Sequence, residues 1–163
     1  MAVSTARKTA PVINPQQMQR LDHQLCFALY SSSLLMTKLY KPVLGALGLT
    51  YPQYLVLIVL WEGDCLGVGE LGARLFLDSG TLTPLLKRME GAGLLVRARA
   101  SADERRVIVT LTAAGRALRR KASHVPTDVA CATGFKLAEL TELTARLQAL
   151  RSNVAWHLAS AAP

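Results

Sequence analysis

Cys26 lies in the stretch HQLCFALYSSSLLMTKLYKP, where apolar residues recur at helical spacing. Tyr30 follows four residues later, so its phenol shares a helix face with the thiol. Tyr40 comes fourteen residues after Cys26, about 21 Å away along a continuous helix, so one chain cannot join them directly. If two copies of this helix pair antiparallel, Tyr40 and Tyr51 of one copy reach Cys26 of the other. Phenolic O–H donors there would favour the thiolate, the reactive form of cysteine.

Packing is the alternative interpretation of these residues. Free cysteine is among the residues most often buried, and tyrosines commonly fill interfaces with one end in water. The chain has three cysteines, so one thiol is left over under any pairing, and a reducing compartment would keep all three free. Cys65, in GDCLG, has no assigned role and is interpreted as a bystander.

Composition limits the class of protein. The chain has 163 residues, 51% of them apolar, which predicts one domain with a hydrophobic core and excludes a disordered protein. Neither a membrane-length apolar run nor the apolar centre of a secretory signal is found, so we expect a cytoplasmic protein with no membrane partner. The net charge of +8 favours a polyanionic partner. The sequence gives no reason to expect a cofactor or a metal site.

Hydrophobic periodicity predicts a helix over about residues 16–40 that is broken by Pro42. Thr50, with Gln53 three residues on, predicts the start of a second helix that runs to Trp61. VGELGARLFL and DSGTLTPLLKRMEGAGL then predict two short helices joined by a tight corner, with Asp78 or Ser79 capping the second. This pattern is typical of a helix-turn-helix.

After Gly93 the period changes to two, which predicts two strands, 94–100 and 107–112, joined by the charged loop SADERR. A helix is expected from Thr112 to near Pro126, followed by a last helix with leucines three and four residues apart. The fold class is therefore mainly α with a small β-hairpin, a winged helix-turn-helix flanked by N- and C-terminal dimerisation helices.

Four regions are expected within one compact domain: a flexible tail (1–15), an N-terminal dimerisation helix with its connector (16–49), the winged helix-turn-helix (50–112) and C-terminal dimerisation helices (113–163). The apolar seams of the terminal helices exceed what a small winged domain can cover, which favours a homodimer. A helical pair within one chain is the alternative.

The second helix of the corner has an outer face suited to double-stranded DNA, because short donors at its N-terminal end precede cations. The residues expected to bind DNA there are Asp78, Ser79, Gly80, Thr81, Thr83, Pro84, Lys87 and Arg88. A solvated face with a capped end is the alternative, and Pro84 is unexpected in an ideal helix. At the hairpin tip, Arg105 and Arg106 are expected to enter a minor groove or grip phosphates, with Asp103 holding Arg105 in place.

Four segments carry a resemblance to a known family: LDHQLCFALYSSSLLMTKLYKP, LGLTYPQYLVLIVLWE, LDSGTLTPLLKRME and DERRVIVTLTAAG. Together they resemble the organic-hydroperoxide-sensing repressors, the OhrR group within the MarR family, over residues 21 to 158. The resemblance implies that Cys26 is the peroxidatic sensor. It also implies that Tyr40 and Tyr51 of the partner subunit donate hydrogen bonds to it and that Tyr30 lines the same pocket.

Cys131, in TDVACATG, stands where the two-cysteine branch of this group has its resolving residue. By resemblance, Cys26 of one chain would form a disulfide with Cys131 of the other, which protects the sensor from over-oxidation. A buried small residue is the alternative for Cys131. The implied function is a repressor of an inverted-repeat operator, which hydroperoxide releases to express a thiol peroxidase.

Three other functions are compatible with parts of this pattern. A MarR-type repressor that responds to a small aromatic ligand would use the same fold without thiol chemistry. A thiol peroxidase is disfavoured because no arginine accompanies Cys26 and because the helix-turn-helix would be unexplained, so we expect a protein that is not an enzyme. A purely structural dimerisation module is the third, and sequence-selective DNA binding would exclude it.

Overall fold

The computed structural model describes residues 19–100 and 103–161, and the tail expected over residues 1–15 lies outside them. The described residues form two compact units, and the boundary between them falls between Lys38 and Leu39.

The N-terminal region contains a 3-10 turn, η1 (Leu21–His23), and a long helix, α2 (Leu25–Gly45), which begins in the first unit and ends in the second. The prediction that Pro42 breaks this helix was wrong. A proline near the end of a helix removes only the bond from its own nitrogen, here to the Lys38 carbonyl, and the last turn continues. The Ala46 N–H still donates to the Pro42 carbonyl at 3.4 Å.

Helix α3 (Tyr51–Glu62) begins where the sequence predicted. The Thr50 backbone N–H donates to Gln53 Oε1 at 2.8 Å, which closes the predicted capping box. Because this local contact fixes the first turn, the apolar residues that follow enter the core at helical spacing.

The predicted helix-turn-helix is confirmed as α4 (Val68–Leu75) and α5 (Ser79–Gly91). Phe76 makes the corner with a left-handed backbone, φ 55°. Asp78, rather than Ser79, is the N-cap of α5. Helix α5 continues through Pro84, whose missing N–H leaves one helical bond unmade.

A three-stranded antiparallel sheet in the order β1-β3-β2 forms the wing: β1 (Leu66–Gly67), β2 (Leu95–Ala100) and β3 (Asp103–Leu111). Leu95 lies opposite Leu111 in the register of the hairpin. The hairpin was predicted, but a loop over 101–106 was wrong because β3 already begins at Asp103. Strand β1 was not predicted, since two residues carry no periodicity.

Three helices follow the sheet: α6 (Ala113–Lys121), α7 (Val125–Ala132) and α8 (Leu137–Ser160). The prediction of one helix ending near Pro126 was wrong, because Pro126 lies in the first turn of α7. In a first turn the missing N–H of proline would have had no helical partner, so proline begins a helix there as readily as it ends one.

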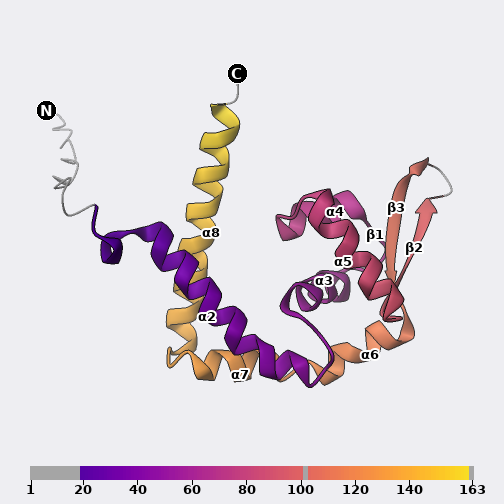
Figure 1. Cartoon of the computed structure of the whole chain (residues 1–163), viewed down its shortest axis with the longest axis horizontal. Helices are drawn as coiled ribbons and strands as arrows, with labels where there is room; N and C mark the ends of the chain where they lie inside the picture. Colours follow the sequence, from indigo (N-terminus) through magenta and orange to yellow (C-terminus); the bar gives the residue numbers. More distant parts are fainter. Residues whose placement is uncertain (1–18, 101–102, 162–163) are drawn as a thin grey trace, which may run out of the picture. The chain divides into compact units, whose positions relative to one another are not determined.

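The core lies among α3, α4, α5 and the inner face of the sheet, which Figure 1 shows gathered on one side of the hairpin. Its fully buried side chains include Leu57, Leu60, Leu71, Leu82, Leu86, Met89, Leu95 and Val109. Helix α8, in contrast, has no buried residue in the single chain. Over the described ranges, no helix combines the length and apolarity that crossing a membrane requires.

Candidate functional site

The Cys26 thiol is exposed on α2, in the first unit. Tyr30, one turn further along the same helix, has 62% of its surface exposed. Phe27 and Leu29 are also exposed beside them. The thiol therefore lies on an open apolar surface of its own unit and is not a core residue of the single chain.

Three tyrosines of the second unit form an aromatic cluster. The ring centroids of Tyr40 and Tyr51 are 4.5 Å apart, and those of Tyr40 and Tyr54 are 6.2 Å apart. Burial raises the pKa of Tyr40, and the neighbouring phenols of Tyr51 and Tyr54 raise it further. Burial also raises the pKa of Tyr51. Both phenols therefore keep their protons at neutral pH and can act as hydrogen-bond donors.

Sequence reasoning selected Tyr40 and Tyr51 but missed Tyr54, which is buried and supports the cluster from the next turn of α3. Tyr54 also meets Trp61 edge-on, with 6.1 Å between ring centroids. The spacing of three residues between Tyr51 and Tyr54 was the available signal, because it puts both rings on neighbouring positions of one helix.

The other two thiols are exposed as well. Cys131 lies near the end of α7, so the alternative of a buried small residue does not fit the single chain. Cys65 lies in the loop after α3 with φ 64°, and the Thr110 hydroxyl donates to its sulfur at 3.5 Å. Within the described residues, no three His, Cys, Asp or Glu side chains gather as a metal site would require.

The N-terminal end of α5 is held by Asp78. Its carboxylate accepts the Thr81 N–H at 2.8 Å and the Thr81 hydroxyl at 2.9 Å. The N–H contact, and then the hydroxyl, lower the pKa of Asp78, so it remains an anion at the positive end of the helix. A Cβ at Gly80 would lie only 3.0 Å from Asp78 Oδ1, which favours glycine beside the cap. Asp78 thus positions the first turn of the helix.

Most of the predicted DNA-facing residues are accessible. Thr83 is half-buried, and the exposed members are Asp78, Ser79, Gly80, Thr81, Pro84, Lys87 and Arg88. Leu82, Leu85, Leu86 and Met89 face the core as expected. Helix α5 therefore presents a continuous polar and cationic outer face.

An open cleft of about 440 Å³ connects this face to the wing. Among the residues that line it are Ser79 and Thr83 of α5 and Arg97 and Arg106 of the sheet. Arg106 is exposed. The side chains of Asp103 and Arg105, and the predicted contact between them, lie outside the described residues.

Arg97 was not selected from the sequence, yet it fixes the wing against the end of α5. Its Nε and Nη2 donate to Glu90 Oε2 at 3.0 and 2.7 Å, and its backbone N–H donates to Glu90 Oε1 at 2.9 Å. The Arg97 side chain, through this contact, is the main cause of the lowered pKa of Glu90. The available sequence signal was an arginine at a polar position of a strand with alternating apolar and polar residues. This signal did not identify Glu90 as the partner of Arg97.

Two comparisons identify the family of this chain. A family model described as transcriptional regulator SarA/Rot matches residues 38–121. The chain is 55% identical over 107 residues to the organic hydroperoxide resistance transcriptional regulator of Bacillus subtilis (strain 168), a match covering 66% of this chain and 73% of that protein. The chain belongs to the OhrR group of the MarR family of transcriptional regulators.

Solved structures of family members agree with this assignment. The structure of reduced AbfR bound to DNA is similar with a TM-score of 0.76 and 34% identity, covering 88% of this chain and 98% of that one. The structure of disulfide-formed AbfR is similar with a TM-score of 0.58 and 37% identity, covering 83% and 95%. The family confirms the predicted winged-helix fold and a regulator in place of an enzyme.

Proposed function

We propose that this OhrR-group chain forms a homodimer that binds operator DNA in the reduced state and releases it when an organic hydroperoxide oxidises Cys26. Cys26 of one protomer then forms a disulfide with Cys131 of its partner. The adjacent Tyr40 and Tyr51 rings are the observation that carries the proposal, because they supply two protonated donors at one place.

DNA binding is supported by the surface that joins α5 to the wing. Hydroxyl donors at the capped end of α5 suit base edges in a major groove, and Lys87 and Arg88 follow them as phosphate ligands. Arg106 extends the cationic surface toward an adjacent groove. The net charge of +8 agrees with a polyanionic partner, and the similar AbfR is named as DNA-bound in its reduced form.

A dimer is supported by the apolar row of α8. Leu143, Leu147 and Val154 are spaced four and seven residues apart along one helix, and all three are exposed in the single chain. Leu137, Trp156 and Leu158 are exposed as well. A second protomer would remove this surface from water, which is the usual reason for such a seam.

The chemistry of sensing takes two balanced steps. The Cys26 thiolate attacks the distal oxygen of the hydroperoxide, the O–O bond breaks, and the products are a sulfenic acid and, after protonation of the alkoxide, an alcohol. The thiol of the partner's Cys131 then attacks the sulfenic sulfur, which forms an S–S bond and releases water. Two thiols lose two electrons, and one peroxide is reduced to alcohol and water.

The energy needed for release is modest. A thousandfold loss of DNA affinity corresponds to about 4 kcal/mol between the reduced and oxidised states. A disulfide that holds two helices in a new arrangement supplies energy of this size. The inducer is expected to be organic, because the surface around Cys26 carries exposed apolar side chains.

Arg106→Ala is expected to weaken operator binding about tenfold and to lower the salt dependence by about one counterion, because one phosphate or groove contact is lost. Binding curves at several salt concentrations, on an operator selected from random duplexes, measure both effects. Arg120→Ala is the matched control, since it removes an exposed arginine from the last turn of α6, which is part of neither α5 nor the wing. Equal losses in the two variants would indicate that only net charge matters.

Cys131→Ser is expected to prevent the cross-linked dimer and to leave Cys26 as a sulfenic acid that excess hydroperoxide oxidises further. A gel shift of operator DNA with cumene hydroperoxide, beside a non-reducing gel of the protein, measures release and cross-linking together. We expect wild-type release with cross-linking and little release in the variant. Full, reversible release by Cys131→Ser would contradict the disulfide step and restrict Cys131 to protecting the sensor.

A further inference from the structure

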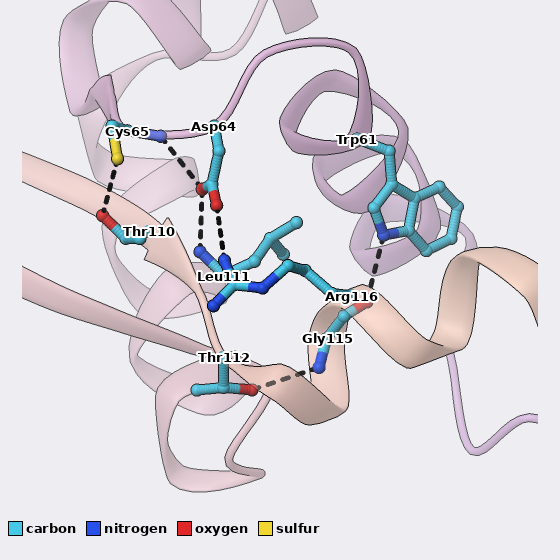
Figure 2. Close-up of polar contacts among 8 residues, drawn as sticks. All are labelled: Trp61, Asp64, Cys65, Thr110, Leu111, Thr112, Gly115 and Arg116. Carbon is cyan, nitrogen blue, oxygen red and sulfur yellow. Dashed lines mark hydrogen bonds and ion pairs between the residues drawn. The ribbon is translucent and has the colours of Figure 1, made fainter.

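The Asp64 carboxylate joins three segments of the second unit (Figure 2). Its Oδ1 accepts the backbone N–H of Cys65 at 2.9 Å and that of Leu111, at the end of β3, also at 2.9 Å. Its Oδ2 accepts Arg116 Nη1, on the first turn of α6, at 2.7 Å. One partly buried carboxylate, 29% exposed, therefore ties the end of α3 to both the wing and α6.

A second contact, close to the one between Asp64 and Arg116, also holds α6 in place. Trp61 Nε1, on α3, donates to the Gly115 carbonyl at 3.0 Å. The Thr112 hydroxyl accepts the Gly115 N–H at 3.1 Å (Figure 2). The same hydroxyl donates to the Gly93 carbonyl at 2.6 Å. A Cβ on Gly115 would lie 2.1 Å from the Leu94 carbonyl oxygen, so the start of α6 packs directly against the residue that precedes β2.

Helix α6 leads to the helix that carries Cys131. The Val125 N–H donates to the Ala122 carbonyl at 3.1 Å, which makes a tight connection from α6 to α7. Ala122, Val125 and Val129 are buried, so both helices are anchored on one side. A displacement of Cys131 would therefore move α6 as well, because α7 and α6 are joined by a short, packed connection.

The outcome at the DNA-binding surface depends on whether α6 is free to pivot. Helix α6 follows β3 directly, with Thr112 as its N-cap, so without side contacts it would turn about Thr112 and leave α3, α5 and the wing where they were. With Arg116 bound to the carboxylate that also holds Leu111, α6, β3 and the end of α3 move together. We infer that Arg116 is a positioning residue for DNA release: its contact with Asp64 passes movement of α7 to the DNA-binding elements.

This inference rests on the proposed oxidation of Cys26 and Cys131, and its test separates the two. Operator affinity is measured for reduced and hydroperoxide-oxidised dimers of wild type and Arg116→Gln, with cross-linking followed on non-reducing gels. The Arg116 side chain is 56% exposed, and exposed ion pairs contribute little to stability, so the variant is expected to fold. We define the release factor as the operator Kd of the oxidised dimer divided by that of the reduced dimer. For Arg116→Gln we expect unchanged operator affinity in the reduced state, unchanged cross-linking and a release factor about tenfold smaller than in wild type.

Arg146→Gln is the matched control, because the exposed Arg146 side chain makes its ion pair with Glu142, at 2.6 Å, within α8. It is expected to keep the wild-type release factor. Release by Arg116→Gln equal to that of wild type would overturn the inference alone. A wild-type dimer that cross-links but keeps its DNA, or that fails to cross-link, would overturn the proposed function together with it.

Trp61→Phe provides a second test at the other contact, since it removes the indole N–H donor and keeps an aromatic ring beside Tyr54. We expect a smaller release factor than in wild type and normal cross-linking. A release factor unchanged in both Trp61→Phe and Arg116→Gln would show that α6 transmits movement without these contacts.

Discussion

Cys26→Ser is expected to bind operator DNA as the wild-type protein does and to keep it when cumene hydroperoxide is added. A serine hydroxyl is not oxidised by a hydroperoxide, so neither the sulfenic acid nor the disulfide forms. In wild type the same treatment is expected to raise the operator Kd about a thousandfold, which corresponds to about 4 kcal/mol. Fluorescence anisotropy of labelled operator, titrated before and after oxidation, measures both constants.

Cys65→Ser is the matched control for this experiment, because it removes another exposed thiol from the same chain. We expect it to release DNA as wild type does. Hydroperoxide-dependent release that persists in Cys26→Ser would defeat the sensor assignment. Release of Cys26→Ser by a small aromatic ligand, with no response to peroxide, would support the ligand-responsive type of MarR regulator instead.

Gly115→Ala is expected to destabilise the protein by about 3 kcal/mol. The added Cβ would lie 2.1 Å from the Leu94 carbonyl oxygen and 3.1 Å from Leu111 Cδ2. Neither the backbone that leads directly into β2 nor a core leucine can move away freely. In a chain of this size, that loss corresponds to a fall in Tm of about 6 to 12 °C. Thermal unfolding of the reduced protein, followed by circular dichroism, measures it.

Gly91→Ala is the control, since nothing lies within 4 Å of the Cβ position at this exposed end of α5. We expect an unchanged or slightly raised Tm, because alanine favours helix more than glycine does. Equal Tm values for Gly115→Ala and wild type would mean that α6 and β2 separate easily, which would also weaken the case for a rigid connection through Asp64.

Features fixed by neighbours in the chain were predictable. The Thr50 and Gln53 pair began α3, an acceptor before SGT capped α5, and the alternation after Gly93 gave the hairpin. In each case the deciding interaction spans a few residues, so its pattern is visible in a short stretch of sequence. Proline was the exception: Pro42 and Pro126 were read as helix ends, although proline is compatible with the last and first turns.

The cysteines and tyrosines of the sensor site were selected from their types and spacing and from a family resemblance. The contacts that hold α5 and the wing in place were not predicted from the sequence. Asp64 binds Leu111 and Arg116, which lie 47 and 52 residues further along the chain. Arg97 binds Glu90 across a turn, and β1 exists only because β3 pairs with it.

The sequence by itself determined the order of the helices and strands, the cap of α5, and which thiol and phenols to consider. Only the tertiary structure decided that Tyr40 and Tyr51 lie ring against ring, that a two-residue strand completes the sheet, and that one carboxylate connects three elements. The physical reason is that the packing of the core determines which side chains at the ends of different elements come close enough to bind each other. When two such residues lie far apart in the chain, no short sequence pattern identifies them as partners.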